Sequence, residues 1–453
     1  MTAPHPRRTR RSAPRAAIIA AFLLIGSGAR EPTHPPARAA TTPLSGLHVQ
    51  GNQLVTAQGH HVILRGVNRS GTEYACMQGT GIFDGPSDAA SIRAMTGWRI
   101  NAVNIGLNEE CWLGLNGVSA RDGGPAYHHA IVAYTHVLES FGIYPLISLF
   151  WEAPGTRQAT DQTAMPDADH ATALWRSVAT TFKGDPAVLL RLKEEPFPAG
   201  NADTPAAWRC WRDGGGACSE GYRVVGMQSL ITTIRATGAP NVIQLSGIQH
   251  ANQMDRFLAY TPADPLHDIM AAVDVYPDVN PCGTVACYNR EYAPIMARMP
   301  FMAGEFGESA DGHICAVTNA TIFMNWMDQH HAGYLAWTWD TWGTRCGDLS
   351  LITDYQGTPH APNGTNYRAH LLRLVAGVQS ARRARLAHAD RASRARPQCG
   401  LRQYIRQQQR APDRCMCIID AIGAHHVRRR ANGSRKRSGW LVSDSLADSA
   451  GVA

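Results

Sequence analysis

Residues 300–307 read Pro-Phe-Met-Ala-Gly-Glu-Phe-Gly, an apolar run whose only charged residue is Glu305. Residues 190–196, Leu-Arg-Leu-Lys-Glu-Glu-Pro, form a second run that ends at Glu195 and a proline. Short apolar runs bounded by Gly or Pro are typical of strands in a parallel sheet, which is buried on both faces. The two runs therefore predict two buried strands, each with a glutamate at its carboxyl end.

Runs of this kind recur between residues 61 and 339 and alternate with amphipathic helical stretches. The predicted strands are 61–67, 101–107, 143–150, 188–195, 241–246, 271–276, 300–306 and 333–339. Helices are predicted at 167–182 and at about 126–140, where apolar residues recur with helical spacing. Eight strands that alternate with helices predict an α/β protein with a single (β/α)8 TIM barrel over residues 44–376. A short hairpin at 47–59 is expected to close the amino-terminal end of the barrel.

The first 39 residues have the organisation of a secretory signal peptide. Five arginines between Arg7 and Arg15 precede an apolar run at 16–25, and Ala37-Arg38-Ala39 offers a small-residue cleavage site. The apolar run is shorter than a membrane-spanning helix, and no later stretch approaches that length. We expect a secreted, extracellular protein without a membrane span.

Charge is distributed unevenly along the chain. Residues 1–43 contribute +6 and residues 380–453 contribute +11 to a net charge of +7, which leaves −10 for residues 44–379. An acidic barrel lacks the basic surface that nucleic acid requires, so no nucleic-acid partner is expected for it. The arginine-rich segment 380–453 is predicted to be a disordered extension, and a basic interaction arm is the alternative.

Eight of the eleven cysteines precede residue 380, and an even number suits disulfides in an oxidising compartment. The plausible pairs are Cys210/Cys218, Cys282/Cys287, Cys76/Cys111 and Cys315/Cys346. A zinc site is the competing interpretation, but the spacings are not those of paired Cys-x-x-Cys ligands. Disulfides are therefore favoured.

The two strand-end glutamates suit one reaction in particular. In (β/α)8 barrels the active site lies at the carboxyl ends of the strands, where Glu195 and Glu305 are predicted to be. Cleavage of a glycosidic bond needs one carboxyl group that protonates the leaving oxygen and a second, ionised one that attacks the anomeric carbon. The pair can supply both, although either glutamate taken alone can equally be an ordinary solvated loop residue.

Aromatic residues provide candidate sugar-binding surfaces. Trp337 and Trp339 share one face of the last strand by alternation, and Trp151 follows the third strand. All three are predicted near the barrel mouth, where indoles stack on apolar sugar faces, with core packing as the alternative for each. Tyr276, near the end of the sixth strand, is expected to donate a hydrogen bond to the nucleophile.

Other chemistries find little support. Histidine doublets occur at His60/His61, His128/His129 and His330/His331, but adjacent residues do not share a helical face, so no metal site is predicted. No glycine-rich phosphate loop follows a strand, and no Gly-x-Ser-x-Gly motif is present, so no cofactor and no serine nucleophile are expected.

From about Leu47 to Leu372 the chain resembles a cellulase-type member of glycoside hydrolase family 5, whose members are retaining (β/α)8 glycosidases. The stretches that resemble the family are 64–71, 101–112, 194–196, 303–307 and 336–340. The resemblance implies that Glu195 is the general acid/base and Glu305 the nucleophile, with the carboxyl groups about 5 to 5.5 Å apart.

The chain departs from the family pattern at four positions that support the site. Asn104 stands where the family usually has arginine, Phe150 and Asp274 where it has histidine, and Glu194 where it has asparagine. Loss of the arginine removes a cation that helps to keep the nucleophile ionised. Arg191 and Lys193, on the same face as Glu195 by alternation, are expected either to pair with the nearby carboxylates as a replacement network or to mark a degraded site.

We therefore expect a secreted, monomeric, retaining glycosidase that cleaves a β-1,4-glucan, with Glu194, Tyr276, Trp151, Trp337 and Trp339 at the substrate. A carbohydrate-binding pseudoenzyme on the same barrel is the alternative, because four supporting positions are altered while both glutamates remain.

Overall fold

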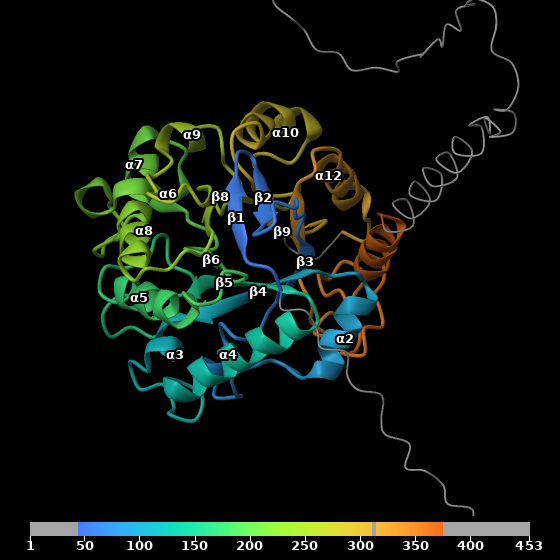
Figure 1. Ribbon diagram of the computed structural model, residues 1–453, viewed down its shortest axis with the longest axis horizontal. Coiled ribbons are helices and arrows are strands. Elements are labelled where there is room, and N and C mark those ends of the chain that lie inside the picture. The colour runs from blue at the N-terminus through green and yellow to red at the C-terminus, as the bar shows by residue number, and fades with distance from the viewer. Residues whose placement is uncertain (1–43, 310–313, 375–453) are drawn as a thin grey trace, which may run out of the picture. The chain divides into compact units, whose positions relative to one another are not determined.

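The computed structural model describes residues 44–309 and 314–374, and its strands close into a barrel (Figure 1). Eight parallel strands pair in the order β10-β3-β4-β5-β6-β7-β8-β9. They are β3 (Arg65–Arg69), β4 (Ala102–Asn108), β5 (Tyr144–Trp151), β6 (Leu189–Arg191), β7 (Ile243–Ser246), β8 (Ile269–Val275), β9 (Phe301–Phe306) and β10 (Gly333–Ala336). Each overlaps one predicted strand, which confirms the (β/α)8 barrel. The predicted signal peptide and basic extension lie outside the described residues.

Strands β6 and β10 end several residues earlier than predicted. Beyond Arg191 the regular ladder of β6 stops, although single hydrogen bonds continue from Leu192 N to Gln244 O (3.3 Å) and from Glu194 N to Leu149 O (3.0 Å). Glu195 therefore lies on an irregular extension of β6, whereas Glu305 lies inside the regular strand β9.

Helices surround the strands in Figure 1. They are α1 (Ala75–Gln78), α2 (Ala89–Gly97), α3 (Glu109–Leu113), α4 (Pro125–Ser140), α5 (Ala171–Phe182), α6 (Pro198–Asn201), α7 (Pro205–Asp213), α8 (Met227–Ala236), α9 (Phe257–Tyr260), α10 (Val285–Glu291), α11 (Ala293–Met296) and α12 (Thr318–Gln329), with a 3-10 turn at Gly215–Ala217. The helix predicted at 167–182 begins only at Ala171. Its first residues form a turn in which Asp167 Oδ1 accepts hydrogen bonds from the backbone N–H groups of Asp169 and His170 (2.9 Å each).

The predicted hairpin is present as β1 (Leu47–Gln50) and β2 (Gln53–Thr56), which pair antiparallel. Leu47 and Leu54 are buried in a cluster with residues from the starts of the barrel strands, among them Tyr144 and Met302. The hairpin thus closes the amino-terminal end of the barrel, as predicted, and leaves the carboxyl ends of the strands for function.

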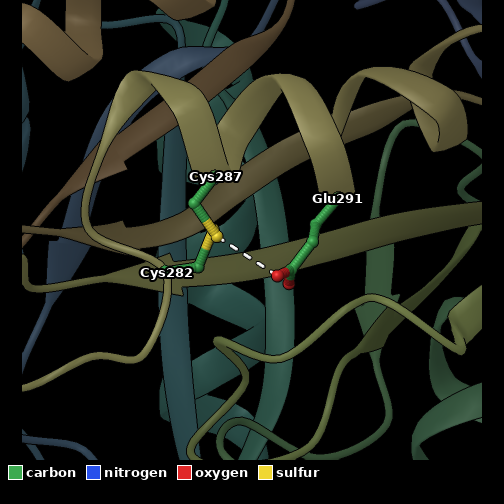
Figure 2. Close-up of side chains that lie close together, drawn as sticks. All are labelled: Cys282, Cys287 and Glu291. Carbon is green, nitrogen blue, oxygen red and sulfur yellow. Dashed lines mark hydrogen bonds between the residues drawn. A yellow bond between two sulfur atoms is a disulfide. The ribbon is translucent and has the colours of Figure 1, made fainter.

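All four predicted disulfides are present: Cys76–Cys111, Cys210–Cys218, Cys282–Cys287 and Cys315–Cys346. Figure 2 shows the Cys282–Cys287 bridge beside α10, with Glu291 Oε1 at 3.2 Å from Cys287 Sγ. Arg290 Nη2 lies 2.8 Å from the same carboxylate. The bonded sulfurs are not thiolates, so these three side chains do not form a metal site.

Within the described residues, every helix is too short or too polar to span a lipid bilayer.

Candidate active site

Glu195 and Glu305 line one cleft at the carboxyl ends of the strands. The cleft has a volume of about 1080 Å³ including the solvent at its mouth, and its walls also contain Tyr276, Trp337 and Phe150. Glu305 is buried, with 4% of its surface exposed, whereas 19% of the Glu195 side chain is exposed. The structure therefore brings together the two glutamates that the sequence singled out, with different access to solvent.

Glu305 is held by the tyrosine that was expected to contact it. The Tyr276 hydroxyl donates a hydrogen bond of 2.9 Å to Glu305 Oε2. The other oxygen, Oε1, is buried and accepts no hydrogen bond from any described residue. One carboxylate oxygen is thus fixed in position, while the second remains free to react.

Glu195 has neighbours that the sequence did not suggest. Gln162 Nε2 donates to Glu195 Oε2 at 3.4 Å, and His250 Nδ1 lies 3.6 Å from the same oxygen. Both neighbours come from loops and belong to no recognisable motif. His250 is also stacked on Phe197, with ring centroids 4.6 Å apart.

The loop that holds His250 has an uncommon backbone. Gln249, His250 and Ala251 have φ angles of 55°, 53° and 61°, in the left-handed region that residues other than glycine seldom adopt. Conformations of this kind persist only where surrounding contacts enforce them, and they concentrate at functional sites. Gln249 and His250 line the cleft of the two glutamates.

Arg191 lies at the centre of the charged residues below the cleft. From β6 it reaches across the barrel interior, where Nη2 is 2.8 and 2.7 Å from the two carboxylate oxygens of Asp274 on β8. Nη1 forms an ion pair with Glu194, and Nε donates to Ser246 Oγ on β7 at 2.8 Å. Glu194, Asp274 and Glu305 each place one oxygen within 4.8 Å of the others, and we call these three carboxylates together with Arg191 the Arg191 network.

A glycine makes room for the guanidinium. A Cβ atom on Gly304 of β9 would lie 2.3 Å from Arg191 Nη1 and 2.5 Å from its Cζ. The residue beside the predicted nucleophile is therefore small for a steric reason. Because the guanidinium occupies the space among the three carboxylates, they do not form a cation site.

One guanidinium faces three buried carboxylates, so the charges do not balance. Burial first, and then the carboxylates of Asp274 and Glu195, raise the pKa of Glu305 well above its usual range, while Arg191 opposes this shift. Burial also raises the pKa of Asp274, again opposed by Arg191. Arg191 is therefore the cation that favours the ionised form of Glu305.

The two predicted cations have different partners. Arg191 pairs with Glu194 and Asp274, as expected if it belongs to a replacement network. Lys193 instead binds Glu152 Oε1 at 2.7 Å, a contact that was not predicted. Beside them, Asn104 Nδ2 donates to Glu194 Oε1 at 2.5 Å and so fixes the orientation of this carboxylate.

Only one of the three predicted tryptophans lines the cleft. Trp337 does so and is stacked on Phe150, with centroids 5.7 Å apart and planes within 8° of parallel. Trp151, at the end of β5, is half-buried beside Tyr74 and does not line the cleft of Glu195 and Glu305.

Trp339 is not a sugar platform. It is fully buried and packs edge-on against Trp98, with centroids 4.9 Å apart. The prediction was wrong because β10 ends at Ala336, so strand alternation does not extend to residue 339. In a regular strand, the N–H groups of residues 337 and 339 would point to the same neighbouring strand. Here Trp337 N donates to Phe306 O of β9, whereas Trp339 N donates to Asn68 O of β3, on the opposite side.

The family model for cellulase, glycosyl hydrolase family 5, matches residues 55–343. The chain belongs to glycosyl hydrolase family 5. As a member of this family it is an O-glycosyl hydrolase, in agreement with the resemblance seen in the sequence. No match was found among curated proteins.

Solved structures similar to this family 5 chain include glucanases and mannanases. A β-glucanase from Saccharophagus degradans in complex with cellotetraose has 17% identity and a TM-score of 0.56, and the match covers 76% of this chain and 98% of that chain. The catalytic domain of a Thermobifida fusca endoglucanase has 15% identity and a TM-score of 0.50, over 73% and 98% of the two chains. The catalytic domain of a mannanase from Streptomyces sp. SirexAA-E has 18% identity and a TM-score of 0.50, over 74% and 93%. At these identities the likeness establishes the fold.

Proposed function

We propose that this family 5 chain is a secreted, retaining glycosidase that cleaves β-1,4-linked glucan, with Glu195 as the general acid/base and Glu305 as the nucleophile. The observation that supports this most strongly is the shared cleft, which has both glutamates, Tyr276 and Trp337 in its walls.

The surroundings of each glutamate suit its proposed step. Glu195, partly open to solvent, protonates the departing glycosidic oxygen while Glu305, positioned by Tyr276, attacks the anomeric carbon and forms a glycosyl ester. Glu195, now ionised, then takes a proton from water, which cleaves the ester and regenerates Glu305 as a carboxylate. Arg191 assists by favouring the ionised form of Glu305 before each cycle.

Substrate preference is proposed from the cleft and from similar structures. Trp337 offers an indole face to a sugar ring, and Phe150 behind it keeps that face in place. The similar structures include a β-glucanase with bound cellotetraose and mannanases, so a β-1,4-linked chain of glucose is proposed and mannan is the competing substrate.

The test is sugar release by the full-length chain from an aryl β-cellobioside and from a panel of β-glucans and mannans. Glu195→Ala and Glu305→Ala are measured in parallel, and Glu139→Gln on the outer helix α4 serves as the control. On the polysaccharides, whose leaving groups need protonation, we expect Glu195→Ala to lose about 10²- to 10⁴-fold and Glu305→Ala at least about 10³-fold in kcat/KM, and the control to keep its activity.

Added azide separates the two roles. In Glu195→Ala it should restore turnover and give a β-glycosyl azide, because the intermediate on Glu305 still forms; in Glu305→Ala any product should be the α-azide. Absence of sugar release by the wild-type chain, with binding to the same polysaccharides intact, would instead favour a carbohydrate-binding pseudoenzyme. Mass spectrometry of protein from the culture medium tests secretion through an amino terminus close to Ala39.

A further inference from the structure

A second group of buried carboxylates lies outside the cleft. Glu109 is the first residue of α3 and directly follows β4, and Asp167 and His170 belong to the turn that precedes α5. One oxygen or nitrogen of each of these three residues lies within 4.8 Å of the others. We call Glu109, Asp167 and His170 the Glu109 group.

The carboxylates of the Glu109 group have few hydrogen-bond donors. Glu109 and Asp167 are both fully buried. Apart from the Ala153 backbone N–H, which faces the Glu109 carboxylate, no described residue donates a hydrogen bond to Glu109, and Asp167 uses Oδ1 in its capping turn but leaves Oδ2 without a donor. Buried charged oxygens with too few partners are costly, so this group requires an explanation.

Their charge is not compensated by a lysine or arginine either. Glu152 lies close by, but Lys193 pairs with it at 2.7 Å. Among residues 44–309 and 314–374, the only basic side chain within ion-pair distance of Glu109 and Asp167 is His170, which is charged only if protonated. The two buried carboxylates therefore lack a permanent positive partner.

The electrostatics of Glu109 agree with a missing cation. Burial first, and then Asp167 and Glu152, raise the pKa of Glu109 well above its usual range, while the backbone of Ala153 lowers it. Without a bound cation, the two facing carboxyl groups can coexist only with an added proton, either shared between them or on His170.

We propose that Glu109, Asp167 and His170 bind a divalent cation, which ties the end of β4 to the start of α5. Nδ1 of His170 lies 3.7 Å from Glu109 Oε2 and 3.5 Å from Asp167 Oδ1. Donors that surround one ion at roughly 2.0 to 2.6 Å are separated by about 3 to 4 Å, which is this spacing. The cation supplies positive charge, and at this spacing its partners are Glu109 Oε2 and Asp167 Oδ1.

Histidine can take part because its protons are mobile between the ring nitrogens. In one tautomer Nδ1–H donates to Ala153 O at 3.2 Å. In the other the proton is on Nε2 and the Nδ1 lone pair points in the same direction, so the ion would lie between Nδ1, Ala153 O and the two carboxylates. The His170 side chain is 16% exposed, so the ion has a route from solvent. Two carboxylates and one imidazole suit Mn²⁺ or Zn²⁺, and Ca²⁺ with additional waters.

Three other groups of metal-ligating residues differ from this one. Cys282 and Cys287 are joined in a disulfide, and the Arg191 network contains its own cation. The third, His136 with Glu139 and Asp185, lies at the surface, where its members can be solvated. In the described part of the chain, the Glu109 group alone combines full burial of two carboxylates with a missing counter-charge.

No sequence motif predicts this group, because Glu109 and Asp167 belong to segments that are distant in the sequence and become neighbours only in the folded barrel. Binding of the cation is independent of the proposed hydrolysis and can be measured without an activity assay.

The experiment begins with the full-length wild-type chain. Metal content is measured by elemental mass spectrometry as purified, then after chelation and dialysis against Ca²⁺, Mn²⁺ or Zn²⁺ separately. We expect about one ion per chain for at least one of these cations. The same cation should raise Tm by several degrees at concentrations far above its Kd, since it binds only the folded protein.

Matched variants locate the ion. Glu109→Gln should abolish both the stoichiometric binding and the rise in Tm. Glu110→Gln changes the next residue in the same helix, which is also fully buried but lies outside the Glu109 group and accepts a hydrogen bond from Asn116 through Oε1; it should leave both unchanged. Absence of bound metal in the wild-type chain, together with no change in Tm at millimolar concentrations of all three cations, would overturn the proposal in favour of an added proton. Equal cation responses in wild type and Glu109→Gln would overturn it in favour of binding elsewhere.

Discussion

The Arg191 network and the Glu109 group are both clusters of buried carboxylates, and each includes a glutamate at the end of a barrel strand. They differ in how their negative charge is balanced. The first has a guanidinium among its carboxylates, for which Gly304 leaves the space, and the second has no lysine or arginine within reach among the described residues. A cluster with a built-in cation can tune the charge of a reacting group, whereas one without it is suited to receive a cation from solution.

Replacement of Arg191 should have the largest effect. Arg191→Met leaves Glu194 and Asp274 buried without a cation, and the loss of one member of a buried ion pair costs about 3 to 5 kcal/mol. We expect the free energy of unfolding to fall by that amount in denaturant titrations, and kcat/KM to fall as well.

Arg235→Met is the matched control for Arg191→Met. Arg235 forms a comparable ion pair with Asp264, at 2.8 Å, on the outer helix α8. It should lose stability while the folded fraction keeps full activity. An equal loss of activity in both variants would show that Arg191 serves stability alone.

Gly304→Ala should have a smaller effect. The added Cβ displaces the Arg191 guanidinium from its place beside Glu305, at a cost of about 1 to 3 kcal/mol for overpacking. Gly97→Ala, at the end of α2 where the new methyl group meets no other part of the protein within 4 Å, is the control and should be neutral or slightly stabilising. A Gly304→Ala enzyme with wild-type kcat/KM contradicts a role for the position of the guanidinium in catalysis.

Asp274→Asn tests the charge balance without changing side-chain size. The Asp274 carboxylate raises the pKa of Glu305, so its removal should lower that pKa. A nucleophile must be ionised, and the acidic limb of the pH profile of kcat/KM should therefore move to lower pH. Arg191→Gln should move the limb to higher pH, because Arg191 lowers the same pKa. If the acidic limbs of the two variants shift in the same direction, or do not shift, the Arg191 network does not control the pKa of Glu305.

Glu109→Gln should have the smallest effect on stability, and it should stabilise the protein in chelator but destabilise it in the presence of the cation. In chelator it removes one of two facing carboxyl groups, so we expect the free energy of unfolding to rise by up to about 1 kcal/mol. With saturating cation, the variant should instead be less stable than the wild type. Thermal unfolding of wild type and Glu109→Gln in the two solutions shows whether the order of their stabilities reverses. If the order does not reverse, the Glu109 group does not receive a cation from solution.

The periodic parts of the chain could be predicted from the sequence. All eight strands and the closing hairpin follow from apolar runs that alternate with helical stretches, and the cysteine pairs follow from number and spacing. Glu195 and Glu305 were placed correctly in one cleft because strand ends meet at one rim of a barrel.

Residues beyond the regular elements could not be predicted in the same way. Trp339 was misplaced because strand alternation was extended past the end of β10. Gln162 and His250 approach Glu195 from loops, whose paths depend on tertiary contacts. The pairing of Lys193 with Glu152 likewise depends on which strand neighbours reach each other inside the barrel.

The most direct test of the catalytic role of Glu305 is covalent trapping. The wild-type chain is incubated with a 2-deoxy-2-fluoro-β-cellobioside that has a good leaving group; the fluorine slows both steps, and the leaving group lets the first proceed. Intact-mass and peptide analysis should find one glycosyl adduct per chain, on Glu305, and none in Glu305→Ala. An adduct on another residue, or hydrolysis of the unfluorinated substrate with inversion at the anomeric carbon, would contradict the account.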